Sequence, residues 1–290
     1  MFGSGVATVG RRPLVWLNVL CLDAPLVAVT WQWFFARNFR VTLPIASRVA
    51  LFLTAWLIYL IDRLVDSISL PTSSVKTLRE AYCLRHKNAW IVLIIMIGLF
   101  DVAFVFCRLD YHVLVPGIIV GLIAIVYLMV NFTFSKLWTA IPLKEVTIGF
   151  LFAAGTLLAL VPHLWLTRST FDSRPMAVAA LMFASLCSLN CMSIAVWERD
   201  FDRAHAKHSI ATRWRRSDVF VRIFALILAA AALLLGTFKF QPWPLAVCLA
   251  ISASLLVAVH FVPVARDERT ALADLVLLTP LAWLLVGKIG

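Results

Sequence analysis

Long, nearly uninterrupted apolar runs alternate with short polar segments along the whole chain. Each run has about the length that a helix needs to cross a bilayer core, roughly 20 residues. The apolar positions do not alternate with period two, so strands of a membrane barrel are not indicated. We therefore predict an all-α, multi-pass membrane helical bundle of about nine transmembrane helices, in one domain over residues 1–290. The predicted spans are 14–36, 45–61, 89–107, 112–130, 145–166, 176–197, 219–238, 243–262 and 270–288.

Composition supports this reading and excludes a soluble domain. The chain is 62% hydrophobic and 14% charged, whereas soluble domains are typically about 45–50% apolar and about 25% charged. In hydrocarbon, only helices and closed barrels satisfy all of their backbone hydrogen bonds. The six cysteines show no paired CxxC spacing, so neither a disulfide framework nor a zinc site is expected.

The formal net charge of +11 could indicate nucleic acid, but in a membrane protein it first reports topology. Cytoplasmic loops carry an excess of Lys and Arg. With the N-terminus in the cytoplasm, most of the 26 Lys and Arg residues fall on the cytoplasmic side, many of them in the segments 62–88 and 198–218. We expect a protein of the bacterial cytoplasmic membrane, surrounded by the lipid bilayer, with no nucleic-acid partner.

Two pairs of acidic residues follow predicted spans on this same side. Asp62 and Asp66 are four residues apart, so on a helix their carboxylates lie on one face. Glu198 and Asp202 repeat the spacing. Carboxylates beside Lys and Arg suit Mg²⁺ bound together with a phosphate-bearing ligand. Ordinary interfacial charges paired with neighbouring arginines are the alternative, and the repetition on one membrane face favours the binding site.

These motifs resemble those of the UbiA superfamily of intramembrane prenyltransferases. The segment from Asp62 to Asp66 is similar to the DRxxD end of the family's first motif. Residues 198–209 resemble its second motif, DxxxDRxxGKxT, with Glu198 replacing the first Asp. The chain departs from the pattern at Ile58 and Tyr59, where the family has Asn-Asp. It also has a basic cluster at 76–87 in place of the usual Lys-x-Arg-Pro.

The resemblance implies Mg²⁺-dependent transfer of an isoprenoid chain from a polyprenyl diphosphate to a small, aromatic or other, acceptor. It implies that Mg²⁺ is held by the catalytic acids Asp62, Asp66, Glu198 and Asp202. It also implies that phosphate oxygens are held by Arg63, Lys136 and Lys207. Asp23 is a separate candidate, because a carboxylate inside a membrane span is costly and is by default functional. It could orient the acceptor or pair with a base from another helix.

Other function classes remain open. A related enzyme would ionise an isoprenoid diphosphate and then cyclise or hydrolyse it. A transporter or a non-catalytic membrane protein could share the fold. Transporters more often have charged or broken helices near the bilayer midplane, whereas most acidic groups here gather at one membrane face. That distribution favours an enzyme.

Overall fold

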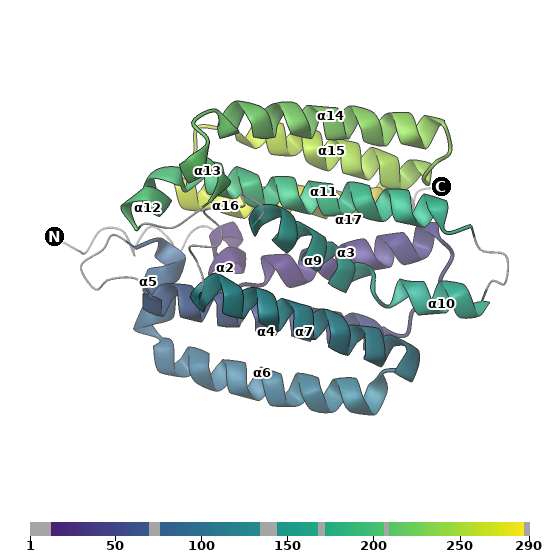
Figure 1. Ribbon diagram of the computed structural model, residues 1–290, viewed down its shortest axis with the longest axis horizontal. Helices are drawn as coiled ribbons and strands as arrows, with labels where there is room; N and C mark the ends of the chain where they lie inside the picture. Colours follow the sequence, from purple (N-terminus) through teal and green to yellow (C-terminus); the bar gives the residue numbers. More distant parts are fainter. Residues whose placement is uncertain (1–12, 70–75, 134–143, 168–171, 206–208, 287–290) are drawn as a thin grey trace.

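The computed structural model describes residues 13–69, 76–133, 144–167, 172–205 and 209–286. Within these ranges the regular elements are helices, and no strand is present (Figure 1). They are α2 (Pro13–Val19), α3 (Asp23–Asn38), α4 (Ile45–Ser69), α5 (Leu78–Arg85), α6 (Lys87–Arg108), α7 (Tyr111–Thr133), α9 (Lys144–Leu157), α10 (Leu160–Thr167), α11 (Arg174–Trp197), α12 (Arg199–Ala204), α13 (Ile210–Arg213), α14 (Ser217–Thr237), α15 (Trp243–Val259), α16 (Arg266–Leu275), the 3₁₀ helix η1 (Val276–Leu278) and α17 (Thr279–Val286).

Several predicted spans form single apolar helices. Among the described residues, α4, α6, α7, α11 and α14 are long and apolar enough to cross a membrane, and α15 is a shorter apolar helix. Many large apolar side chains of α6 and α7 are exposed, as expected of helices that face lipid. The predicted all-α membrane bundle is confirmed.

The predicted continuous helices over 14–36, 145–166 and 270–288 are wrong, because each of these segments is broken. Cys21 has a φ of 56° between α2 and α3, in the left-handed region that ends a helix. A turn separates α9 from α10, and η1 interrupts the last span. Hydropathy does not record such breaks, since the apolar run continues through them.

The core of the bundle is built around α11. Over half of the apolar window of α11 is buried inside the protein, compared with 11% for α7. Trp31, Phe34 and Phe35 of α3 form an aromatic cluster with Phe183 of α11. Close packing fixes the neighbouring helix α9, because a Cβ added at Gly149 would lie 2.4 Å from the backbone N of Ser188 on α11.

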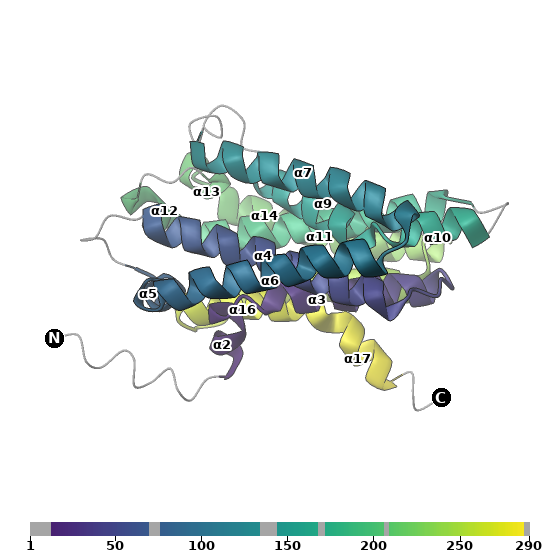
Figure 2. The ribbon, with the colours of Figure 1, turned by 90° about the horizontal axis from the view of Figure 1, so that it is seen from below.

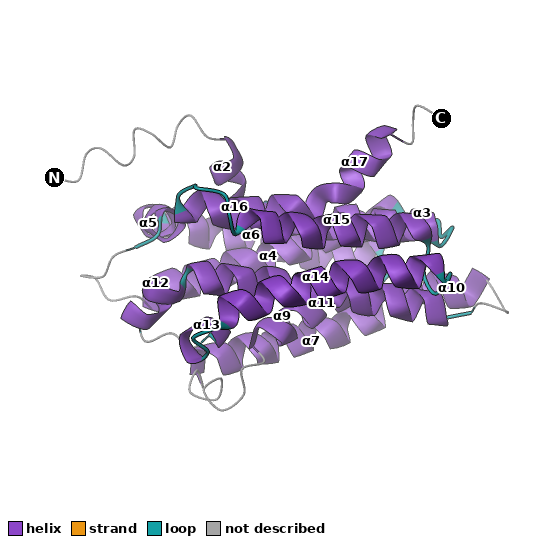
Figure 3. Ribbon diagram, turned by 90° about the horizontal axis from the view of Figure 1, so that it is seen from above, coloured by secondary structure: helices purple, strands orange, loops and turns teal. Residues whose placement is uncertain are grey.

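The short helices mark the two ends of the bundle. Figure 1 shows α5, α12 and α13 together at one end and α10 at the other. Figure 2 and Figure 3 show α2 and α17 on one side of the bundle and α7 on the opposite side. The helix ends that carry the predicted acidic motifs therefore meet at the end marked by α5 and α12.

Candidate functional site

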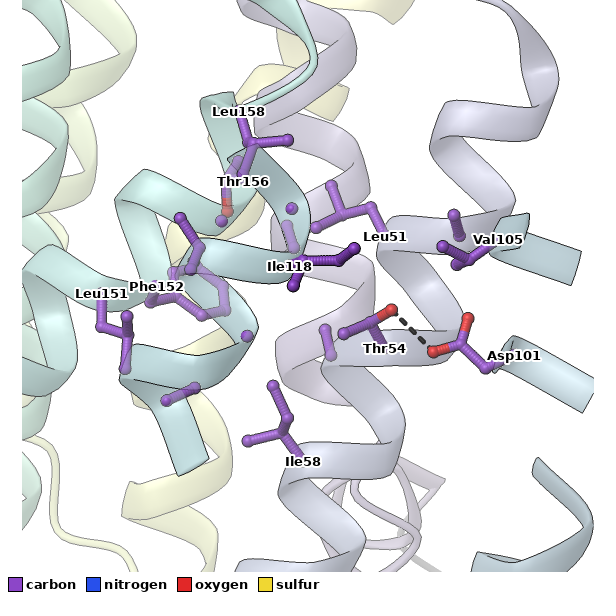
Figure 4. Close-up of a pocket in the computed structure, with 18 of the residues that line it drawn as sticks. Leu51, Thr54, Ile58, Asp101, Val105, Ile118, Leu151, Phe152, Thr156 and Leu158 are labelled. Carbon is purple, nitrogen blue, oxygen red and sulfur yellow. Dashed lines mark hydrogen bonds between the residues drawn. The ribbon is translucent and has the colours of Figure 1, made fainter. Parts of the chain in front are cut away.

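A cavity of about 390 Å³ lies among α3, α4, α6, α7 and α9. Most of its lining is apolar, with Leu51 and Ile58 from α4, Ile118 from α7 and Phe152 from α9 among the residues in view (Figure 4). Polar residues collect where the cavity approaches the end of α4. They are Asp62, Asp66, Tyr127, Asn131 and Lys144. The cavity is thus mostly apolar along its length, with several charged residues gathered at one end.

The first acidic pair reaches this cavity because α4 continues beyond the predicted end of its span. Helix α4 extends to Ser69, so Asp62 and Asp66 lie one helical turn apart on the same helix. Both line the cavity. Ile58 and Tyr59 line the same wall one turn earlier. The positions where the resembled family has Asn-Asp therefore contribute apolar and phenolic surface to the cavity here.

Lys144 brings a positive charge to the acidic end and was not among the predicted site residues. It is the first residue of α9 and lines the cavity. Its neighbour Glu145 is buried and accepts a hydrogen bond of 3.0 Å from the backbone N–H of Ile210 in α13. This contact ties the start of α9 to the segment after the second acidic motif. The sequence signal was a lysine opening an apolar span, which also suits a plain interfacial residue.

The second acidic pair has different surroundings. Glu198 lies between α11 and α12, and its carboxylate accepts a short charged hydrogen bond from Arg79 of α5. Asp202 is a buried residue of α12. Neither residue is part of the cavity lining. Arg79 belongs to the basic cluster at 76–87, so an ion pair links that cluster to the second acidic motif.

Of the three predicted phosphate-binding residues, the structure describes only Arg63. Arg63 is buried but does not line the cavity. It lies on another face of α4, near the thiols of Cys21 and Cys83. Burial raises the pKa of the Cys83 thiol in α5 above its usual range, and this effect outweighs the nearby Arg63 charge. The other two residues of the prediction, Lys136 and Lys207, lie outside the described residues.

Asp23 lies apart from the main cavity. It begins α3 and accepts a hydrogen bond of 2.6 Å from the side chain of Asn18. Asp23 and Asp274 of α16 both line a second, small cavity of about 10 Å³. Asp274 is buried and accepts a hydrogen bond of 2.8 Å from Asn190 of α11. Asp23 thus belongs to a polar cluster at the breaks of the first and last spans, and its role in binding stays a prediction.

The donor set at the acidic end fits Mg²⁺ shared with a substrate. No cluster of three or more His, Cys, Asp or Glu suited to a metal ion occurs in the part of the chain that the structure describes. Magnesium is commonly held by one or two carboxylates plus substrate phosphate oxygens, with no protein cage of its own. Asp62 and Asp66 supply such a pair on one helix face. These residues therefore fit a metal that arrives together with a phosphate ligand.

Comparisons with known proteins identify the fold. No protein-family model and no curated protein matches the sequence. The solved structure of a UbiA homologue from Aeropyrum pernix K1 matches with a TM-score of 0.61 and 15% identity, over 92% of this chain and 98% of its own. A digeranylgeranylglyceryl phosphate synthase matches with a TM-score of 0.51 and 15% identity, over 93% and 96%. The chain is an integral membrane protein with the UbiA fold, as the motif resemblance predicted.

Proposed function

We propose that this protein is a membrane-embedded, Mg²⁺-dependent prenyltransferase that transfers an isoprenoid chain from a polyprenyl diphosphate to a small acceptor. The observation that carries the proposal is the cavity, which is mostly apolar along its length and bears Asp62, Asp66 and Lys144 at one end. A polyprenyl diphosphate has the same division into an apolar chain and one charged end. The likeness in fold to a UbiA homologue and to a digeranylgeranylglyceryl phosphate synthase supports the proposal.

In this proposal Asp62 and Asp66 hold Mg²⁺, and Lys144 contacts phosphate oxygens. The metal would supply positive charge that stabilises the departing diphosphate. Lys144 adds a fixed positive charge at the same end of the cavity, which favours negative charge as it develops. The apolar walls exclude water, so that an activated chain reacts with the acceptor and is not hydrolysed.

The bond changes are those of an alkyl transfer. The bond between the allylic carbon and the diphosphate oxygen breaks, and the diphosphate leaves with the electron pair. A nucleophilic atom of the acceptor bonds to the allylic carbon, and the acceptor releases a proton. Aromatic faces attract a nearby cation, and Tyr59, Tyr127 and Phe152 provide such faces along the cavity wall.

Glu198 and Asp202 are proposed to act at the same end with a further Mg²⁺. In the structure Glu198 is paired with Arg79, so its carboxylate becomes a metal ligand only when that pair opens. A diphosphate is a strong partner for a guanidinium group. It can draw Arg79 away from Glu198, which would couple substrate binding to completion of the second acidic site. Arg63, Lys136 and Lys207 stay proposed phosphate contacts.

The end with α5, α12 and α13 is proposed to face the cytoplasm, because Lys and Arg concentrate in the segments 62–88 and 198–218. The function is tested by mass spectrometry of lipid products. Membranes containing the protein are supplied with geranyl, farnesyl and longer diphosphates, with and without aromatic acceptors. The proposal requires products that join chain and acceptor and need Mg²⁺. Cyclised or hydrolysed chains alone would identify the related enzyme class, and unchanged diphosphates under all conditions would contradict catalysis.

A further inference from the structure

Asp101 is a buried carboxyl group inside the apolar part of the cavity, in a position that the proposed function does not use. It lies on α6 and is 5% exposed, whereas the preceding residue, Phe100, is 58% exposed. Asp101 is therefore turned inward while its neighbour faces outward. A carboxyl at membrane depth is costly and marks a functional position by default.

One oxygen of this carboxyl has a partner, and the other does not. Asp101 Oδ2 accepts a hydrogen bond of 2.7 Å from the hydroxyl of Thr54 on α4 (Figure 4). Asp101 Oδ1 is buried and has no hydrogen-bond partner among the described residues. A buried polar atom without a partner costs free energy, because its hydrogen bonds to water are lost and not replaced. The pairing with Thr54 holds the carboxyl in place with its second oxygen available to a ligand.

Two more buried polar atoms in the same cavity also lack a hydrogen-bond partner among the described residues. Gln32 and Thr156 each line the cavity and are 1% exposed. Gln32 Oε1 and Thr156 Oγ1 find no hydrogen-bond partner within the described ranges. A carboxylate oxygen and an amide carbonyl oxygen both accept hydrogen bonds, and a threonine hydroxyl can donate or accept. The unpartnered groups are thus mainly acceptors, so a ligand with a hydrogen-bond donor would satisfy them.

This polar group is separate from the acidic end. Thr54 precedes Asp62 on α4 by roughly two helical turns, about 12 Å at 1.5 Å per residue. A simple isoprenoid chain offers no hydrogen-bond donor at that distance from its diphosphate. A molecule that is otherwise apolar but carries a hydroxyl group would provide one.

We propose that the cavity contains a hydroxyl-recognition site, in which Asp101, held by Thr54, accepts a hydrogen bond from the hydroxyl of an otherwise apolar molecule. Gln32 and Thr156 provide further hydrogen-bonding positions for the same ligand. The proposal rests on the proposed function only in taking the cavity as the substrate site. The hydroxyl belongs either to the acceptor or to the molecule that fills the apolar part of the cavity.

The test compares two probes that differ only in the donor: para-nonylphenol and its methyl ether, para-nonylanisole. Binding to the purified full-length protein is measured through tryptophan fluorescence. The wild type is expected to bind the phenol at least about tenfold more tightly than the ether, the effect of one hydrogen bond to a charged or buried partner. Asp101→Leu should abolish this ratio, and Thr54→Val should reduce it. Equal affinities in the wild type, or an unchanged ratio in Asp101→Leu, would overturn the proposal.

Two further measurements separate this inference from the proposed function. Thermal unfolding in detergent shows whether Asp101→Leu is folded, and Thr54→Val keeps the test valid if it is not. Binding of geranyl diphosphate with Mg²⁺ should survive in Asp101→Leu. If the wild type binds no diphosphate but still prefers the phenol, the proposed function fails and the hydroxyl site stands. If the phenol and the diphosphate bind together, the hydroxyl belongs to the acceptor. If they compete, the hydroxyl belongs to the molecule that fills the apolar part of the cavity.

Discussion

The acidic pair of α4 and the acidic pair at the junction of α11 and α12 share one spacing but not one environment. Asp62 and Asp66 line a large apolar cavity. Glu198 is held by Arg79 of α5, and Asp202 is buried outside the cavity lining. The spacing places Asp62 and Asp66 on one face of α4, whereas Glu198 lies at the junction before α12 and Asp202 lies within α12. The neighbouring helices decide whether the carboxylates line the cavity or lie outside its lining.

This difference indicates separate roles for the two acidic pairs. The first pair lines the cavity, where a ligand can reach both carboxylates. Glu198 of the second pair is balanced by the guanidinium of Arg79, and this ion pair braces α5 against the end of α11 until a ligand competes for Arg79.

The Asp62→Asn, Asp66→Asn double variant removes both charges from the cavity end with little change in side-chain size. We expect Mg²⁺-dependent product formation to fall by about a thousandfold, at the upper end of what one electrostatic contribution supplies in catalysis. Turnover in membranes is the measurement. Asp200→Asn is the matched control, because the Asp200 side chain is 99% exposed and should leave turnover unchanged. Equal losses in both variants would show that the first pair has no special role.

Arg79→Ala tests the brace. The Arg79 and Glu198 side chains are only 12% and 13% exposed, and removing one partner of such a pair leaves the other charge uncompensated. We expect a loss of stability of about 3 kcal/mol, measured by denaturant unfolding in detergent. Arg203→Ala is the control, since its contact with Asp200 is 4.0 Å long and exposed. A variant as stable as the wild type would argue against the brace.

Gly149→Ala tests whether the close packing of α9 against α11 stabilises the bundle. The added Cβ would lie 2.3 Å from Ser188 Oγ as well as close to the Ser188 backbone, so one helix must shift. Overpacking of this kind costs about 2 kcal/mol, read from the thermal unfolding midpoint. Gly155→Ala serves as the control on the same helix, because no atom lies within 4 Å of its added Cβ. Similar stabilities for the two variants would contradict the packing argument.

Lys144→Gln is expected to have the smallest effect. Lys144 contributes one positive charge at the cavity end, so its loss should weaken binding of a polyprenyl diphosphate by about tenfold, the effect of one charged hydrogen bond. Titration with geranylgeranyl diphosphate in the presence of Mg²⁺ gives the affinity. Lys87→Gln changes an exposed lysine at the start of α6 and should bind as the wild type does. A loss in Lys87→Gln of the same size would indicate a general surface charge effect.

The sequence predicted the class of fold and the helices with unbroken apolar runs, such as α6 and α11. It did not predict the breaks at Cys21 and in the last span, because hydropathy averages over a local change of backbone conformation. The resemblance drawn from two degenerate motifs agreed with the UbiA fold of solved structures.

For the site, the spacing of residues within one helix could be predicted from the sequence, but contacts between residues far apart in the chain could not. The shared face of Asp62 and Asp66 follows from helical geometry. The pairing of Arg79 with Glu198 joins residues far apart in the chain, and no periodicity encodes it. Asp101 was overlooked because a single acid in a long apolar run changes the mean hydropathy little, although its pairing with Thr54 shows that it faces the cavity.

Direct binding of geranylgeranyl diphosphate to the purified protein, with and without Mg²⁺, tests the central claim most closely. The account predicts saturable binding that requires Mg²⁺ in the wild type and is lost in the Asp62→Asn, Asp66→Asn variant, while that variant remains folded. Binding that is absent from the wild type, or that is equally strong without Mg²⁺ and in the double variant, would contradict the assignment of the acidic end of the cavity as a diphosphate site.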